Sequence, residues 1–279
     1  MTVDLHLHST VSDGRLAPAA LVRLAHAQGV RVMALTDHDS TDGVAEATAA
    51  GAELGVRVIP GVELSTDLPG VSIHMLGLFL DDREPEFQRR VRQFREARLE
   101  RAQRMVDALG RLGVPVRLER VLELAGEGSV GRPHVAQALL EAGHVASIDD
   151  AFERYLSRDG PAYFEGYRLT PIEAVELIHG VGGLAAWAHP LELDGRDWHQ
   201  YLPALLEAGV DGIESYYGKS YPHAVVDDLR ATSARHNLLP TVGSDYHGFP
   251  SMDTLPGSVA APADLLARLE ARVAERRRG

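Results

Sequence analysis

The stretch VDLHLHSTVSDG, residues 3–14, places two histidines one residue apart in the first predicted strand of the chain. Residues i and i+2 of a strand share a face, so His6 and His8 point the same way and the two leucines beside them point the other way. A buried imidazole has two ring nitrogens to satisfy, and two such rings side by side are costly unless they share a partner. The pattern therefore predicts a pair of ligands for one metal ion.

The bulk composition restricts the kind of site and of partner. The chain has 279 residues, is 45% hydrophobic, carries a formal charge of −12 and contains no cysteine. This length suits one large domain, or one domain with a small insert. Without thiols a metal must be held by His, Asp and Glu, which favours Mn, Fe or Zn. We expect no long duplex nucleic acid as partner, and neither a membrane span nor a signal peptide, hence a cytoplasmic enzyme.

Short apolar strand patterns alternate with amphipathic helical patterns in the first third and the last third of the chain. The predicted strands are residues 2–8, 30–39, 56–64, 71–80, 183–190, 210–217 and 238–247. The predicted helices between and after them are residues 17–29, 41–55, 170–183, 202–209, 224–237 and 262–277. Alternation of this kind predicts a parallel α/β sheet, open or closed.

The middle of the chain shows helical patterns without clear strands, at residues 84–113, 117–126, 132–143 and 148–157. We therefore expect a barrel made of residues 1–83 and 169–279, with residues 84–168 as a helical insert. The first helix of the insert carries eight arginines. Glu96 and Glu100 can pair with neighbouring arginines at helical spacing, which favours a solvated face. A basic wall that guides an oligonucleotide is the alternative.

Polar residues gather where the predicted strands end. They are Asp13, His38, Glu63, His189, Asp245 and His247, while His74 lies within the fourth strand. The carboxyl ends of parallel strands share one rim in a barrel, and α/β barrels place their chemistry there. Residues that are scattered along the chain are thus expected to meet in one pocket.

Each of these residues also has an ordinary interpretation. Asp13 could serve a turn, Glu63 could lie on a loop surface, and His74 alone could be a hydrogen-bonded core residue; their joint placement favours a shared site. Asp37 and Asp39 are expected to support a ligand histidine or to cap the loop. The remaining histidines are expected to be ordinary surface or hydrogen-bonded residues: His26, His144, His179, His199, His223 and His236.

Six segments occur in a characteristic order: DLHLHSTVSDG, ALTDHD, PGVELS, IHMLG, AHP and GSDYH. Together they resemble the polymerase-and-histidinol-phosphatase (PHP) family, over nearly the whole chain. The resemblance implies a distorted (β/α)7 barrel, similar to a TIM barrel, which agrees with the seven predicted strands. It also implies three divalent metal ions, with Mn²⁺ as the first choice and Fe²⁺ or Zn²⁺ as alternatives.

The resemblance further implies a set of nine metal ligands. By this likeness one ion and an attacking hydroxide are held by His6, His8, Glu63 and Asp245. Glu63 bridges to a second ion, which is also bound by His74 and His189. The third ion is bound by Asp13, His38 and His247.

The segment GRPHVAQALLEAG, residues 131–143, resembles the stand-alone branch of the family that hydrolyses nucleotide phosphates. That branch contains 3′,5′-nucleoside bisphosphate phosphatases and 5′→3′ exonucleases acting on short RNA. The likeness implies that Arg132 and His134 contact a substrate phosphate, and a simple helix start with Pro133 at its first position is compatible with this. Lys219 and Tyr217 follow the sixth predicted strand and could contact substrate or only shape the loop.

The expected function is therefore that of a metal-dependent phosphoesterase. Its predicted substrate is a small nucleotide, above all the 3′-phosphate of a nucleoside 3′,5′-bisphosphate, or the 5′ end of short RNA. A histidinol-phosphate phosphatase is one alternative. A metal-dependent amidohydrolase of C–N bonds and a non-catalytic, metal-stabilised module are alternatives of other classes. The sequence leaves open the choice between bisphosphatase and exonuclease, the native metal and the oligomeric state.

Overall fold

The computed structural model describes residues 1–68, 71–126, 128–165, 169–193, 195–218, 221–249 and 254–278. In this part of the chain the framework is a seven-stranded sheet whose strands lie side by side in chain order. They are β1 (Thr2–Asp4), β2 (Val30–Leu35), β3 (Arg57–Leu68), β4 (Val71–Leu78), β5 (Leu184–Trp187), β6 (Gly212–Tyr217) and β7 (Leu239–Gly243). The predicted α/β class is confirmed.

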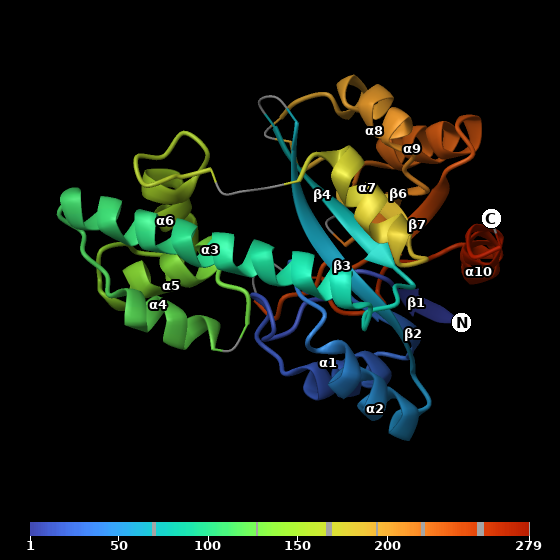
Figure 1. Ribbon diagram of the computed structural model, residues 1–279, viewed down its shortest axis with the longest axis horizontal. Helices are drawn as coiled ribbons and strands as arrows, with labels where there is room; N and C mark the ends of the chain where they lie inside the picture. The colour runs from blue at the N-terminus through green and yellow to red at the C-terminus, as the bar shows by residue number, and fades with distance from the viewer. Residues whose placement is uncertain are drawn as a thin grey trace.

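The sheet closes on itself through the residues that follow β1. Leu5 N–H donates to the Val242 carbonyl (3.0 Å), and Asp245 N–H donates to the His6 carbonyl (2.9 Å). The backbone of the H-x-H stretch therefore lies along the end of the last strand. The result is a distorted barrel in which the first strand lies beside the last (Figure 1).

The fourth strand departs from the expected parallel arrangement. β4 runs antiparallel to both β3 and β5, while the other neighbouring pairs are parallel. The cause is the short link after β3, because a parallel crossover needs a dozen or more residues. In this hairpin His74 lies opposite Ser65. His74 consequently sits near the end of the barrel at which the parallel strands finish.

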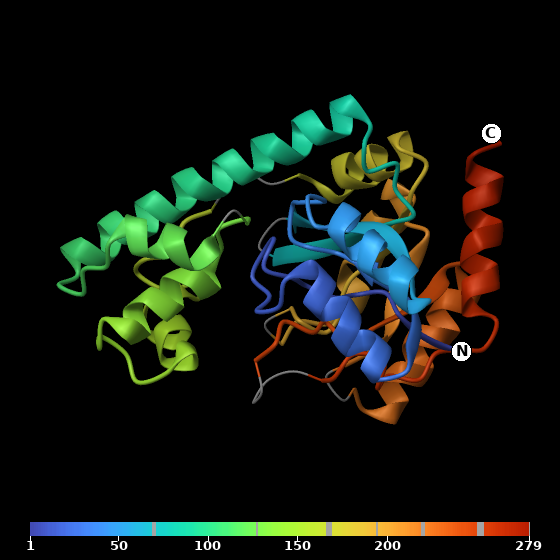
Figure 2. The ribbon, with the colours of Figure 1, turned by 90° about the horizontal axis from the view of Figure 1, so that it is seen from below.

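Helices cover the outside of the barrel. α1 (Pro18–Ala27) and α2 (Val44–Leu54) pack on β2 and β3, and their core includes Leu21, Met33 and Leu35. The second half of the chain adds α7 (Pro171–Gly180), α8 (Leu202–Ala208), α9 (His223–Arg235) and α10 (Leu265–Arg276). Figure 2 shows α10 on the side of the barrel away from the middle segment of the chain.

The segment between β4 and α7 lies beside the barrel (Figures 1 and 2). It comprises α3 (Pro85–Arg111), α4 (Leu118–Ala125), α5 (Arg132–Glu141), α6 (Ile148–Ala151) and a π-helical turn (Phe152–Leu156). These helices share a hydrophobic cluster of their own, while the first half of α3 packs into the barrel core through Phe87 and Phe94. The predicted division of the chain at residues 84 and 168 stays a prediction.

None of the helices in the described ranges has the length and apolar character that a membrane crossing requires. The expected cytoplasmic location is a separate matter and stays a prediction.

Candidate metal centre

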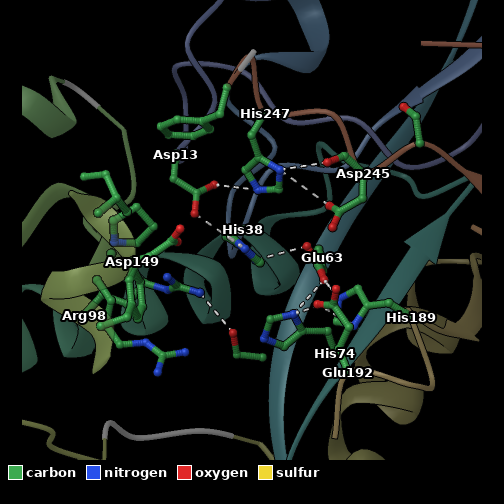
Figure 3. Close-up of a pocket in the computed structure, with 18 of the residues that line it drawn as sticks. Asp13, His38, Glu63, His74, Arg98, Asp149, His189, Glu192, Asp245 and His247 are labelled. Atoms are coloured by element: carbon green, nitrogen blue, oxygen red, sulfur yellow. Dashed lines mark hydrogen bonds and ion pairs between the residues drawn. The ribbon is translucent and has the colours of Figure 1, made fainter. Parts of the chain in front are cut away.

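Glu63 lies at the centre of a cluster of imidazoles (Figure 3). Its Oε2 lies 3.2 Å from His6 Nε2, 3.1 Å from His8 Nε2 and 3.1 Å from His38 Nδ1. These rings come from the stretch after β1 and from the loop after β2, so the parallel pairing of β1, β2 and β3 brings them together. One carboxylate oxygen thus faces ring nitrogens from two separate segments of the chain.

The other oxygen of Glu63 faces the opposite half of the cluster. Oε1 lies 2.7 Å from His74 Nδ1 and 3.0 Å from His189 Nε2. Because β4 is antiparallel, His74 reaches this point from the first half of its strand, whereas His189 follows β5. Glu63 is therefore placed to bridge two groups of ligands.

Two further carboxylates complete the cluster. Asp245 Oδ1 lies 3.2 Å from both His6 Nε2 and His8 Nε2. Asp13 Oδ1 lies 3.4 Å from His247 Nε2, and Asp13 Oδ2 lies 3.8 Å from His38 Nε2. All nine residues predicted as ligands thus converge on one site, although their role as ligands stays a prediction.

Four groups in this site have ligand atoms within 4.8 Å of one another. They are His6, His8, Glu63 and Asp245; His8, Asp13, His38 and His247; His38, Glu63 and His74; and His189, Glu192 and Asp245. The first group is the set that the family resemblance implies for a single ion. Glu192 was not predicted, because a carboxylate three residues after a strand-end histidine has no distinctive sequence pattern.

The donor set fits bound divalent cations. Among the described residues, His6 Nε2, His8 Nε2, His38 Nδ1, Asp13 Oδ1 and Glu63 Oε2 are buried without a hydrogen-bond partner. An unpaired buried polar atom costs about 1–3 kcal/mol, so such atoms are rare in proteins. Imidazole nitrogens and carboxylate oxygens directed at a common space are the ligand types that Zn²⁺, Fe²⁺ and Mn²⁺ use.

The charge states of Glu63 and His38 agree with this interpretation, whereas carboxylates of the cluster outweigh burial and raise the pKa of His6 and His189. Burial raises the pKa of the Glu63 carboxyl, but His38, His74 and His6 outweigh burial and hold that pKa well below its usual range. Burial lowers the pKa of His38 well below its usual value, although Glu63 acts in the opposite direction. A charged carboxylate and a neutral imidazole are the forms that bind metal.

A buried carboxylate that the sequence reasoning missed orients two of the candidate ligands. Glu214, on β6, is fully buried. Its Oε1 lies 3.1 Å from His6 Nδ1, and its Oε2 accepts the backbone N–H of His189 at 2.8 Å. An Nδ1–H that is held by a carboxylate leaves Nε2 free for a metal. A glutamate within the apolar strand pattern of residues 210–217 was the available signal.

Asp37 holds the loop that carries Asp13 through hydrogen bonds. The Asp37 carboxylate accepts hydrogen bonds from Ser9 N–H (2.7 Å), Ser9 Oγ (2.7 Å) and Ser12 Oγ (2.6 Å). Asp37 therefore caps this loop, which was one of the two roles expected for it. Asp39, the other flanking acid, instead pairs with Arg98 of α3.

Two of the candidate ligands have strained backbones. His189 and Asp245 have φ angles of +29° and +54°, in the left-handed region that residues with a side chain rarely adopt. The backbone N–H of His189 donates to Glu214, and that of Asp245 donates to the His6 carbonyl. Strain that the surroundings maintain in this way is concentrated at functional sites in proteins.

Tyr217 contacts a candidate ligand. The ring is buried, and its hydroxyl donates to Asp245 Oδ2 at 2.6 Å and lies 3.1 Å from Glu192 Oε1. It is absent from the described residues that line the central cavity, so the contact seen here supports Asp245, and the substrate contact expected of Tyr217 stays a prediction. Lys219 lies outside the described residues.

The cluster forms one side of a cavity of about 420 Å³, a size typical of ligand sites. The opposite side is formed by the middle segment of the chain, with Arg98, Arg101 and Arg132 among its described lining residues. Ile148 and Phe152 add apolar surface there. Asp149 also lines this side, but the three arginines outnumber it, so a cationic wall faces the cluster of acids and imidazoles.

The two residues of the GRPH motif have different surroundings. Arg132 lines the cavity, and its guanidinium lies 5.6 Å from the ring centre of Phe152 and 5.7 Å from that of Tyr163. His134 is not among the described residues that line this cavity. Its Nδ1 accepts the Gly131 N–H at 3.0 Å, which caps α5. The phosphate contact expected of His134 stays a prediction.

The surface of α3 agrees in part with the expected solvated face, because Arg89 pairs with Glu86 at helical spacing and both side chains are exposed. Within the described ranges Glu96 and Glu100 form no ion pair. Arg95 and Arg98 instead pair with Asp42 and Asp39 of the barrel. Within the described residues the pairing expected of Glu96 and Glu100 is therefore missing, and carboxylates of the barrel hold two of the α3 arginines instead.

Comparison with known proteins identifies the family. The PHP domain model matches residues 4–158. A 5′-3′ exoribonuclease of Haemophilus influenzae is 38% identical over 251 residues, which are 88% of this chain and 90% of the relative. A 3′,5′-nucleoside bisphosphate phosphatase of Chromobacterium violaceum is 35% identical over 251 residues, 88% of this chain and 87% of the relative.

The fold comparison agrees. A solved structure described as an amidohydrolase from Chromobacterium violaceum, with bound sulfate and no metal, has a TM-score of 0.88 and 33% identity, and the match covers 98% of this chain and 97% of that one. The family resemblance seen in the sequence is thereby confirmed. Since the family model spans more than half of the chain and these relatives extend over most of it, the chain belongs to the PHP domain family.

Proposed function

We propose that this chain removes the 3′-phosphate of nucleoside 3′,5′-bisphosphates, trims short 5′-phosphorylated RNA from its 5′ end, or does both. It is a metal-dependent phosphoesterase, a hydrolase of phosphoric ester bonds, as its family membership indicates. One observation carries the proposal: a cluster of candidate metal ligands faces three cavity-lining arginines among the described residues.

The cluster would perform the bond cleavage. We propose that it holds three ions, Mn²⁺ or alternatively Fe²⁺ or Zn²⁺, which would acidify a water and neutralise the phosphoryl oxygens. Glu63 serves both halves of the cluster because each of its oxygens faces different imidazoles. Glu214 fixes the ring of His6, and Tyr217 fixes the Asp245 carboxylate. These contacts hold the site in position before substrate arrives.

The arginine wall would bind the part of the substrate that is not cleaved. Arg132 has a planar fork that suits two phosphate oxygens. Its position between the rings of Phe152 and Tyr163 restricts its motion, so less conformational entropy is lost on binding. We propose that Arg132 grips the second phosphate of a bisphosphate, or the next phosphate of a short RNA.

The same wall argues against the alternatives. Histidinol phosphate carries an ammonium group, which a wall of arginines would repel. A neutral amide, the substrate of a C–N amidohydrolase, offers no negative charge for those guanidinium groups. Two negative groups at opposite ends of one small molecule match the cavity best.

A phosphate-release screen with Mn²⁺ tests the proposal. It compares adenosine 3′,5′-bisphosphate, AMP, histidinol phosphate and a 5′-phosphorylated RNA pentamer, with products separated by chromatography. We expect release from the bisphosphate, stepwise shortening of the pentamer, or both, and no release after chelation. Turnover of histidinol phosphate alone, or of none of the four, would contradict the proposal.

A further inference from the structure

Arg98 is a mostly buried cation of the arginine wall, and the account above gives it no role of its own. It lies on α3, and its side chain is only 14% exposed. Figure 3 shows it on the side of the pocket that faces the candidate ligands. An arginine so far removed from water needs a specific set of partners.

Two of its three nitrogens fix its orientation. Nε donates to Asp39, and Nη2 donates to Ser65 Oγ at 3.0 Å. Both partners are themselves held: Asp39 N–H donates to the Glu63 carbonyl at 3.0 Å, and Ser65 N–H donates to Asp39 Oδ1 at 3.3 Å. Nη1 has no hydrogen-bond acceptor in the described part of the chain, although the side chain lines the cavity.

These contacts place the guanidinium directly beside the cluster. Ser65 lies two residues after Glu63 on β3, so the two side chains share a face of the strand. Asp39 directly follows the candidate ligand His38. On the other side, a Cβ atom built on Gly131 would lie 3.6 Å from Nη1. Arg98 is thus between the cluster and the start of α5.

The geometry of phosphoryl transfer indicates what a cation at this position could do. In an in-line displacement the attacking and leaving oxygens lie on opposite sides of phosphorus. If water attacks from the side of the cluster, the leaving oxygen faces the wall formed by α3 and α5. The barrel itself fixes the orientation of Arg98 in that wall, through Asp39 and Ser65.

We propose that Arg98 is a catalytic residue whose Nη1–H donates to the ester oxygen that leaves, an inference that rests on the proposed phosphoesterase function. A bond forms between the water oxygen and phosphorus while the P–O ester bond breaks. The electron pair of the broken bond stays on the leaving oxygen, which takes a proton from solvent, and the attacking water loses its proton to solvent. Arg98 remains protonated and stabilises the developing charge without reorganising.

Leaving-group dependence tests this role. The substrates are adenosine 3′,5′-bisphosphate, which has a poor alkoxide leaving group, and p-nitrophenyl phosphate, which has an activated one. For Arg98→Ala we expect kcat to fall about 100-fold on the bisphosphate, as for loss of one oxyanion donor, and by less than about 10-fold on the aryl ester. Arg98→Lys gives the same comparison should the alanine variant fail to fold.

Arg95→Ala is the matched control. Arg95 lies one turn earlier on α3 and also pairs with the barrel, through Asp42, but it is not among the described lining residues of this cavity. We expect it to keep both rates close to wild type. Metal content by elemental analysis should match wild type for both variants. Arg98→Ala should melt at a lower temperature because Asp39 loses its partner, so the rates are compared well below that temperature.

Equal losses on the two substrates would overturn the assignment, since they would indicate that Arg98 only anchors α3. So would loss of bound metal in Arg98→Ala, or a loss of the same size in Arg95→Ala. Failure of the wild type to hydrolyse either ester would refute the proposed function instead, and is therefore distinguishable from failure of the Arg98 assignment.

Discussion

Replacing Glu214 by glutamine should weaken metal binding although Glu214 itself faces away from the proposed ions. Its two oxygens serve two donors: the Nδ1–H of His6 at 3.1 Å and the backbone N–H of His189 at 2.8 Å. A glutamine has a single carbonyl oxygen, so it can accept from only one of these. Its NH2 group must then face the other donor.

The two ways of placing the amide both have a cost. If the carbonyl stays on the His189 N–H, the NH2 group faces His6 Nδ1 and favours the tautomer with its proton on Nε2, which cannot bind metal. If the amide flips, the strained backbone of His189 loses its acceptor. A hydrogen bond to a charged group contributes about 1.5–3 kcal/mol. We therefore expect a 10- to 100-fold weaker metal affinity, since about 1.4 kcal/mol corresponds to tenfold.

Competition between the protein and a chelating dye for Mn²⁺ measures this change directly. Asp211→Asn is the control, because Asp211 is also a buried carboxylate bonded to a histidine, His179, but lies outside the cluster. That variant should lose stability and keep the wild-type affinity for metal. An unchanged affinity in Glu214→Gln would show that the tautomer of His6 is fixed by something else and would refute the reasoning.

Three further changes have definite expected outcomes. His8→Ala should lose metal, by elemental analysis, and nearly all turnover; retained turnover with metal bound would exclude its ligand role. Arg132→Ala should raise KM for a bisphosphate about 10- to 100-fold and much less for a simple monoester, and equal effects would exclude the clamp. The pKa of Asp211 is lowered, because hydrogen bonds from His179, Ala185 N–H and Arg276 outweigh burial. Its stabilisation is therefore present above the unfolded pKa of about 3.9 and lost as pH falls through the folded value. The urea midpoints of Asp211→Asn and wild type should thus differ most near neutral pH and converge below about pH 4, and a constant difference would contradict this.

Strand periodicity explains why the sequence sufficed to locate the cluster. The i, i+2 spacing of His6 and His8 fixes a common face, and the positions of Glu63 and Asp245 near the ends of predicted strands indicate a common rim, although β3 continues beyond Glu63 to Leu68. The direction of β4 was also within reach, because the link that follows β3 is too short for a crossover. The prediction of a shared rim depends on the order of the strands, so it holds although β4 runs in the opposite direction.

The residues that orient the candidate ligands could not be predicted from strand periodicity. Glu214 acts on a histidine 208 positions away, and a pairing of that separation has no local pattern. Arg98 is one of eight arginines on a helix, and only the docking of α3 on the barrel distinguishes it. The ring of His134 caps a helix, a role that its motif did not predict, and the phosphate contact that the motif implies stays a prediction. The period of a strand or helix predicts which residues share a face, but it does not predict which distant residues they contact.

The two sides of the cavity divide the work of recognition and cleavage between different parts of the chain. The barrel supplies carboxylates and imidazoles that need cations, and the middle segment supplies guanidinium groups that need anions. A phosphate held between them satisfies both at once, which neither side can do alone. A protein of net charge −12 can therefore capture an anionic substrate, because the local field of the site and not the total charge decides binding at this range. It follows that substitutions on the wall should alter which phosphate ester is chosen, whereas substitutions in the cluster should abolish cleavage of every ester alike.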